Sequence, residues 1–269
     1  MPSPRVESRM AAIMTHVASP VREPVLSMRG VRKTFARGLA RSIRKTAALV
    51  DVDLELGPAE VVAVVGAEAS GKTPLLQCAS GLLRADAGEV RWFGETFPGG
   101  GAVPGVAYVP AVPVFYPFLT VRDVVACRAG RELSLWEKPA SAVSHALDAL
   151  ELGARSNASI ALLSRAESKR LAVAEALASR PRALLVDTCT SDLSPAISDI
   201  TCRAIASFAA SGGSALIAVR EPGAVAAIAS RLVFLSEGRV SPPFLRSASV
   251  DDKPTAIPLV PRFVAETLH

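Results

Sequence analysis

The run "VVAVV" (61–65), followed by "GAEASGKT" (66–73), constrains the fold more than any other part of the chain. Five consecutive apolar residues, four of them β-branched, are typical of a strand buried on both faces of a parallel sheet. The apolar spacing of "KTPLLQCASGLL" (72–83) predicts a helix directly after the turn. A buried strand, a tight turn and a helix form the basic unit of an α/β protein with crossover connections.

The turn matches the pattern G-x-x-x-x-G-K-[ST]. Backbone N–H groups at a helix N-terminus cradle an anion, Lys72 can neutralise outer phosphates, and the Thr73 hydroxyl can ligate Mg²⁺. The alternative is an ordinary strand–turn–helix with a chance lysine, and the flanking strand and helix favour the nucleotide loop. The candidate nucleotide-binding residues of the loop are Gly66, Ser70, Gly71, Lys72 and Thr73.

Three residues of this segment oppose tight phosphate binding. Glu68 places a carboxylate in the loop, where we expect it to repel phosphates. Ala69 adds a Cβ where close backbone approach favours glycine. Pro74 fits the first helical turn but has no N–H to donate.

The segment "LLVDTCTSDLSP" (184–195) ends an apolar strand in one carboxylate, Asp187. Buried parallel strands deliver such groups to the edge of the sheet where ligands bind, so Asp187 and Thr73 together are a candidate Mg²⁺ site. No acid follows directly at Thr188. An active site, the remains of one, and a chance strand end are all open interpretations at this point.

Strand-like and helical patterns alternate through the rest of the chain. We predict an α/β fold of the P-loop NTPase type, with a mainly parallel sheet, an inserted α-helical subdomain at about 112–165 and an N-terminal antiparallel β region. The prolines of residues 1–24 predict a disordered leader. The predicted nucleotide-binding domain covers 25–240, and 241–269 form a C-terminal tail with little pattern.

Composition excludes several classes of protein. No apolar run approaches the ~18 residues of a membrane-spanning helix, and the first 20 residues lack a signal-peptide core. Four scattered cysteines without C-x-x-C and three separate histidines disfavour disulfide or zinc sites. We therefore expect a cytoplasmic protein.

The net charge is +5, and basic residues crowd into one short segment. A contact with anionic lipid or nucleic acid is one interpretation. A solvated loop is favoured, because no aromatic residues interleave with the charges, and we expect no specific nucleic-acid partner. The basic residues of this segment are Arg32, Lys33, Arg37, Arg41, Arg44 and Lys45.

Several segments in register resemble the ATPase subunit of ATP-binding-cassette (ABC) transporters. These are "LLQCASGLLRADAGEVRWFGE" after the phosphate loop, "YVPAVPVFYPFLTVRDVV", and "LSRAESKRLAVAEALASRPRALLVDTCTSDLSP". The resemblance runs from about Val25 to Val240. It implies that two such domains close head to tail on two ATP molecules, each site combining one chain's phosphate loop with the other's signature. It also places Phe35 where the family has an aromatic that stacks on adenine, although a core position for Phe35 is nearly as good an interpretation.

Most catalytic positions implied by the resemblance have changed. The signature, usually Leu-Ser-Gly-Gly-Gln, contains Ser164, Arg165, Ala166 and Glu167 after Leu163. A positioned general base contributes ~10²–10⁴-fold, and a threonine hydroxyl is no base at neutral pH. The other changed positions are Ala111 for the Mg²⁺-contacting glutamine, Thr188 for the general base, Ser194 for the interface-loop aspartate and Arg220 for the γ-phosphate histidine.

The leading hypothesis is a catalytically degenerate ATP-binding subunit, with weakened binding of ATP and Mg²⁺, peripheral at the inner face of the membrane. We expect it to pair with an integral membrane transporter subunit and a second ATPase subunit, as a heterodimer rather than a homodimer. An active transport ATPase with Arg165 and Arg220 as substitute phosphate ligands is the second hypothesis. A soluble scaffold or nucleic-acid-associated protein is the third.

Overall fold

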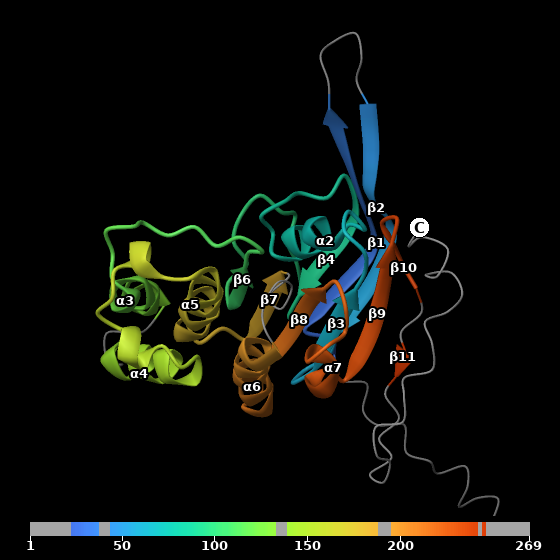
Figure 1. Cartoon of the computed structure of the whole chain (residues 1–269). Coiled ribbons are helices and arrows are strands. Elements are labelled where there is room, and N and C mark those ends of the chain that lie inside the picture. Colours follow the sequence, from blue (N-terminus) through green and yellow to red (C-terminus); the bar gives the residue numbers. More distant parts are fainter. Residues whose placement is uncertain (1–22, 38–43, 133–138, 188–194, 242–243, 246–269) are drawn as a thin grey trace, which may run out of the picture.

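The computed structural model describes residues 23–37, 44–132, 139–187, 195–241 and 244–245 (Figure 1). The predicted sites Thr188 and Ser194 lie outside the described residues, as does most of the predicted leader and tail. In chain order the elements are β1 (Leu26–Arg37), β2 (Arg44–Leu56), β3 (Val61–Val65), α2 (Lys72–Ala79), β4 (Ala87–Trp92), β5 (Glu95–Thr96), β6 (Val106–Val109), α3 (Val121–Glu132), α4 (Pro139–Ala149), η1 (Gly153–Arg155), η2 (Ile160–Leu162), α5 (Arg165–Ala178), β7 (Ala183–Asp187), α6 (Pro195–Ala210), β8 (Ser214–Val219), α7 (Val225–Ile228), β9 (Arg231–Ser236), β10 (Arg239–Val240) and β11 (Phe244–Leu245).

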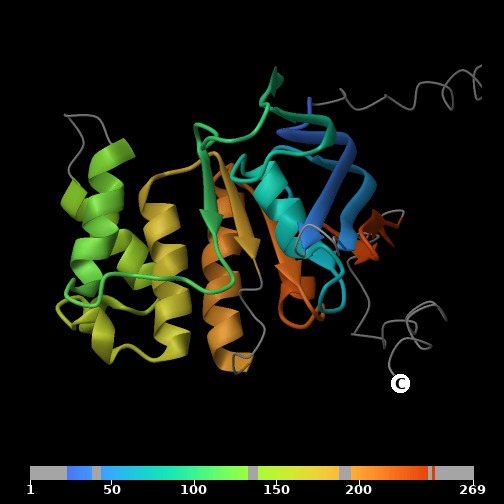
Figure 2. The same cartoon turned by 90° about the horizontal axis from the view of Figure 1, so that it is seen from above.

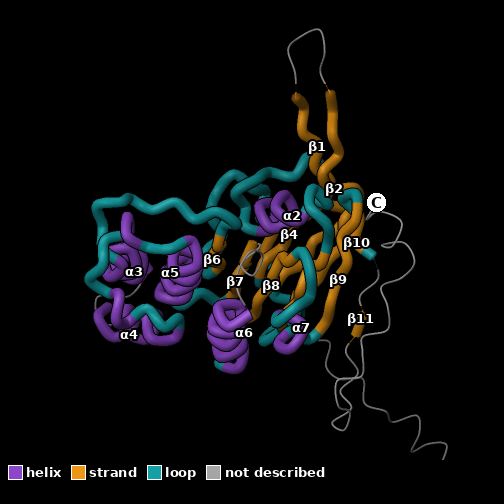
Figure 3. The backbone as a smooth tube through the Cα atoms, in the orientation of Figure 1, coloured by secondary structure: helices purple, strands orange, loops and turns teal. Residues whose placement is uncertain are grey.

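The central sheet has the strand order β10-β9-β3-β8-β7-β6, and its neighbours from β9 to β6 are parallel (Figure 3). Every residue of β3, β7 and β8 is buried, as expected for strands covered on both faces. The non-sequential strand order requires helical crossovers, which place the carboxyl ends of β3, β7 and β8 at one edge. The predicted parallel α/β core is therefore confirmed.

A second sheet, of order β2-β1-β4-β5, is antiparallel throughout. Its register begins with Leu26 opposite both Leu56 and Trp92, so β1 lies between β2 and β4. Figure 1 shows β1 and β2 extending as a hairpin beyond the rest of the molecule. This confirms the predicted N-terminal antiparallel region.

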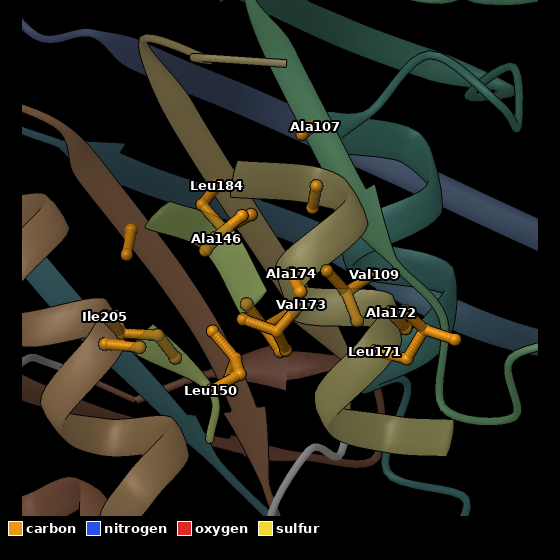
Figure 4. Close-up of a cluster of buried hydrophobic side chains, with 14 of the residues drawn as sticks. Ala107, Val109, Ala146, Leu150, Leu171, Ala172, Val173, Ala174, Leu184 and Ile205 are labelled. Carbon is orange, nitrogen blue, oxygen red and sulfur yellow. The ribbon is translucent and has the colours of Figure 1, made fainter. Parts of the chain in front are cut away.

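Alternate residues of β3 face two different cores. Val61, Ala63 and Val65 pack with the helices α3 to α6, and part of this cluster is drawn in Figure 4. Val62 and Val64 pack with α2 and the antiparallel sheet. The period of two side chains along a strand thus lets one apolar run serve both faces.

Helices α3 and α4 lie inside the range 112–165 proposed for a helical subdomain, and α5 packs against both of them. The helical layer therefore continues to Ala178, past the predicted boundary. Figure 2 shows α3 to α5 at the end of the molecule far from the antiparallel sheet. In the predicted tail, β11 pairs with β9, an element that its sequence pattern did not indicate.

Candidate functional site

The glycines at both ends of the phosphate loop are fixed by close backbone contacts. Gly66 follows β3, and a Cβ there would lie 2.3 Å from the Leu235 carbonyl oxygen. Gly71 caps α2 with φ of 107°, and a Cβ there would lie 2.3 Å from the Ala48 carbonyl oxygen. Because atoms cannot approach so closely, both positions require glycine. The loop is thereby held against β2 and β9.

Lys72 lies at the centre of this loop, with only 7% of its surface exposed. Its Nζ donates hydrogen bonds to the carbonyl oxygens of Gly66 (2.8 Å) and Ala67 (2.6 Å), and to Ser70 Oγ (3.3 Å). Burial lowers the pKa of Lys72, and the nearby Arg220 charge lowers it further, while Asp187 opposes both effects. Lys72, Asp187 and Arg220 are therefore close enough to interact electrostatically.

The atypical residues of the loop adopt distinct positions. Ala69 has a φ of +62°, the left-handed conformation that favours glycine. Glu68 is exposed at the loop tip, and its charge raises the Lys72 pKa slightly against the effect of burial. Pro74 lies within the first turn of α2, where the Leu75 N–H still bonds to the Gly71 carbonyl oxygen at 2.9 Å.

Asp187 ends β7 and is 1% exposed. The Tyr108 hydroxyl, on the neighbouring strand β6, donates a hydrogen bond of 3.3 Å to Asp187 Oδ2. Burial and the adjacent carboxylate raise the pKa of this phenol, while a hydrogen bond from the Gln77 side chain on α2 opposes the increase. Tyr108 and Gln77 are site residues that the sequence analysis missed. The detectable signal was a phenol in the otherwise apolar strand "VAYV".

Three further residues proposed for the nucleotide site are Arg220, Ala111 and Phe35. Arg220 directly follows β8 and is exposed. Ala111 is half-buried, two residues after β6. Phe35 is 42% exposed on β1, with Lys33 Nζ 5.9 Å from its ring centroid, so this ring is not part of the core.

The signature-like residues form a complete capping box at the start of α5. The Glu167 N–H donates to Ser164 Oγ (3.2 Å), and the Ser164 N–H donates to Glu167 Oε2 (2.9 Å). The Ser164 hydroxyl also donates to Glu167 Oε2, at 2.8 Å, and Arg155 Nε donates to Glu167 Oε1, at 2.9 Å. These hydrogen bonds lower the pKa of Glu167 to about 2, the largest effect coming from the Ser164 backbone. Arg165 is exposed and Ala166 is half-buried.

The donor set is consistent with a magnesium nucleotide. Thr73 and Asp187 supply the hard oxygen atoms that Mg²⁺ prefers, and Lys72 supplies the phosphate charge. Among the described residues, no cluster of histidine, cysteine and acidic side chains could hold another metal ion. In the described part of the chain, no helix has the length and apolarity needed to cross a bilayer.

A glycine-bounded loop between a buried parallel strand and a helix, with an aspartate ending a second strand, defines a P-loop nucleotide-binding fold. Comparison with known proteins then narrows the class. A family model for ABC transporters matches residues 49–191. The chain belongs to the ABC transporter family and is of the ATP-binding subunit type.

Relatives cover most of the chain. The lipoprotein-releasing system ATP-binding protein LolD of Ruegeria pomeroyi is 35% identical over 230 residues, which are 81% of this chain and 98% of LolD. The aliphatic sulfonates import ATP-binding protein SsuB 2 of Xanthomonas axonopodis is 34% identical over 214 residues, 76% of this chain and 68% of SsuB 2. The dimeric bacterial ABC transporter cassette MJ0796 shares the fold, with a TM-score of 0.74 at 21% identity, over 82% of this chain and 98% of that one.

Proposed function

We propose that this chain is a catalytically degenerate ATP-binding subunit of an ABC transporter, which binds Mg-ATP weakly and serves as a nucleotide-sensing or structural partner. The relatives named above are ATP-binding proteins of import and lipoprotein-releasing systems, so the family supports the transporter role. The degeneracy is inferred from residues of this chain alone.

The capping box at Ser164 is the observation that carries the proposal. In the family the signature approaches the γ-phosphate bound by the partner subunit. Here the single Ser164 hydroxyl proton is bonded to Glu167, whose pKa of about 2 keeps it ionised at neutral pH. An ionised carboxylate at that position repels phosphate, and Arg165 adds bulk where the family has glycine. The signature is therefore poorly suited to stabilise a partner's ATP.

The chain's own phosphate loop is also poorly equipped for hydrolysis. Ala111 offers no polar group to Mg²⁺ or the attacking water, and Thr188 is no general base. When bound, Mg²⁺ would be held by Thr73 and Asp187 and would neutralise charge on the phosphates. Lys72 would bind the outer phosphates after giving up its bonds to the loop carbonyls.

Pairing with a different, intact ATPase subunit follows from these defects. A homodimer would contain two sites with both halves impaired, whereas a heterodimer supplies one intact half to each site. Light scattering of the purified chain with Mg-ATP tests this proposal. We expect a monomer, and an ATP-dependent homodimer would contradict the heterodimer.

A strip of apolar side chains supports docking to a membrane subunit at the cytoplasmic face. Val112, Val114, Tyr116 and Phe118, between β6 and α3, are each at least 69% exposed, and the two rings lie 5.5 Å apart. Such exposed apolar strips mark interaction sites. We expect Val114→Asp and Phe118→Asp to reduce recovery of the chain with the membrane fraction. The control Leu82→Asp changes an exposed leucine outside the strip and should retain it.

Calorimetry and ATP turnover test the nucleotide role. We expect weak Mg-ATP binding that Lys72→Ala abolishes, with turnover at background. Lys72-dependent turnover within the ordinary enzyme range of ~1–10³ s⁻¹ would refute degeneracy.

An active ATPase is the second candidate, favoured by the Arg220 charge beside Lys72. Thr188→Glu separates the two, because a large gain in turnover would mean that the rest of the site is competent. That gain should then be lost in Thr188→Glu/Arg220→Ala. Arg203→Ala is the matched control for Arg220→Ala, since Arg203 is an exposed arginine whose partner is Glu151 (3.0 Å).

The basic segment gives the nucleic-acid hypothesis little support. Arg32 pairs with Asp51 at 2.9 Å, and Lys33 pairs with Asp86 at 2.7 Å, so two of its charges are engaged within the fold.

A further inference from the structure

We propose that Tyr108 is a positioning residue that orients the Asp187 carboxylate toward the Mg²⁺ ion of a bound nucleotide. The inference deepens the proposed function and rests on it, because it requires that the chain binds nucleotide with Mg²⁺.

Three elements converge on Asp187. Strands β6 and β7 are parallel neighbours, with Tyr108 in register with Leu185, two residues before Asp187. From there the Tyr108 hydroxyl reaches Asp187 Oδ2 at 3.3 Å. The side chain of Gln77 on α2 lies near the same phenol and lowers its pKa. The Tyr108 hydroxyl is therefore the group that contacts the Asp187 carboxylate directly, and Gln77 lies beside that hydroxyl.

Gln77 also lies close in sequence to the second candidate metal ligand, Thr73. Gln77 lies four residues after Thr73 on α2, so their side chains share one face of the helix. Thr73 and Asp187 come from different elements, and the Gln77–Tyr108 pair spans the distance between those elements. Gln77 on α2 lies near Tyr108 on β6, and Tyr108 in turn contacts Asp187 on β7.

The geometry favours a role for Tyr108 in orienting Asp187 over a role limited to giving that buried carboxylate a hydrogen-bond partner. Groups that hydrogen-bond a metal ligand from behind fix its orientation, and removing one typically costs about 10–100-fold in metal affinity. The family's polar group after β6 is replaced by Ala111 in this chain. Tyr108 instead supplies a polar group from β6 itself, and that group contacts the carboxylate directly.

The test is the Mg²⁺ dependence of nucleotide affinity, measured by calorimetry with ADP in Mg²⁺ and in EDTA. In Tyr108→Phe we expect the factor by which Mg²⁺ strengthens ADP binding to fall by about 10-fold or more, with the EDTA affinity unchanged. Gln77→Met keeps the Tyr108–Asp187 bond and should show a smaller fall. With Mn²⁺ in place of Mg²⁺, the variants should rank in the same order by the factor by which the metal ion strengthens ADP binding.

Thr96→Val is the matched control. This substitution also removes a hydroxyl that donates to a carboxylate, since Thr96 Oγ1 lies 2.6 Å from Glu89 Oε1. Thr96, however, lies on the antiparallel sheet. In this variant, Mg²⁺ should strengthen ADP binding by the same factor as in the unmodified chain. Urea unfolding verifies that each variant is folded, and Gln77→Met carries the test if Tyr108→Phe does not fold.

Two results would overturn the proposal while leaving nucleotide binding intact. One is a Mg²⁺ factor in Tyr108→Phe equal to that of the unmodified chain. The other is an equal loss of affinity in Mg²⁺ and in EDTA, which would mean a purely structural role. If the unmodified chain binds no nucleotide in either condition, the proposed function itself fails, and the metal-positioning role fails with it.

Discussion

The Ser164 hydroxyl oxygen lies 2.8 Å from Glu167 Oε2, so the residue that caps helix α5 is bonded to a residue of its first turn. The backbone N–H of each residue also donates to the side chain of the other, and Arg155 donates to the second carboxylate oxygen. The segment that resembles the family's signature is thus a well-formed helix cap.

This cap makes stability depend on pH. The pKa of Glu167 falls from its ordinary value of 4.5 to about 2 on folding, so its contribution is fully present above pH 4.5 and is lost as the pH falls toward 2. We expect Glu167→Ala to reduce the free energy of unfolding by about 1 kcal/mol at pH 7. Urea titrations from pH 7 to 3 should show the difference shrinking below pH 4.5, and a constant difference would contradict the assignment.

The left-handed conformation of Ala69 predicts a gain on substitution by glycine. Removing this strain should raise the free energy of unfolding by about 1–2 kcal/mol. The greater conformational entropy of glycine in the unfolded chain should lower it by about 0.4–1 kcal/mol. Ala69→Gly should therefore stabilise the chain slightly and should strengthen nucleotide binding in calorimetry. Ala67→Gly, in the same loop but without a positive φ, should destabilise it instead.

Lys72 illustrates a cost of the phosphate loop to stability. Its pKa is lowered chiefly by burial, which means that folding disfavours its charged form. The free energy of unfolding should accordingly increase as the pH rises through the lowered folded pKa. Lys72→Met should abolish nucleotide binding without lowering this free energy by more than about 1 kcal/mol at pH 7. Calorimetry and urea unfolding of the same preparation measure both effects, and a large loss of stability would show that Lys72 holds the loop together.

Trp92 connects the antiparallel sheet to α2. Its ring is fully buried, and Nε1 donates a hydrogen bond of 2.7 Å to the Ala79 carbonyl oxygen at the end of the helix. Trp92→Phe leaves that oxygen without its buried donor and opens a cavity, so we expect a loss of about 2–4 kcal/mol in unfolding free energy. A change below about 0.5 kcal/mol in urea denaturation would mean that water replaces the indole completely.

The elements that the sequence predicted well are those whose pattern is local. The apolar runs of β3 and β7 and the loop from Gly66 to Thr73 carry their own signals, and the structure has a strand, a turn and a helix there. The S-x-x-E spacing of Ser164 and Glu167 is likewise a local pattern typical of a capping box, which the structure contains.

The missed features depend on strand order and on distant neighbours. Tyr108 and Asp187 are 79 residues apart, and their contact exists only because β6 lies next to β7. Likewise, the exposure of Phe35 follows from the long hairpin of β1 and β2, so the sequence left its two interpretations open. β11 was unpredictable because two residues pair with β9 without any periodic pattern.

The contacts of the loop glycines have a consequence for how such a chain changes over time. Gly66 and Gly71 pack against backbone atoms of β9 and β2, and the Gly238 N–H bonds to the Ser70 carbonyl oxygen at 3.0 Å. Selection for folding alone would therefore preserve these glycines even in a chain that no longer bound ATP. Selection for folding alone would not preserve Lys72, because folding disfavours its buried charge. In descendants of this chain, the lysine rather than the glycines would record the loss of the nucleotide.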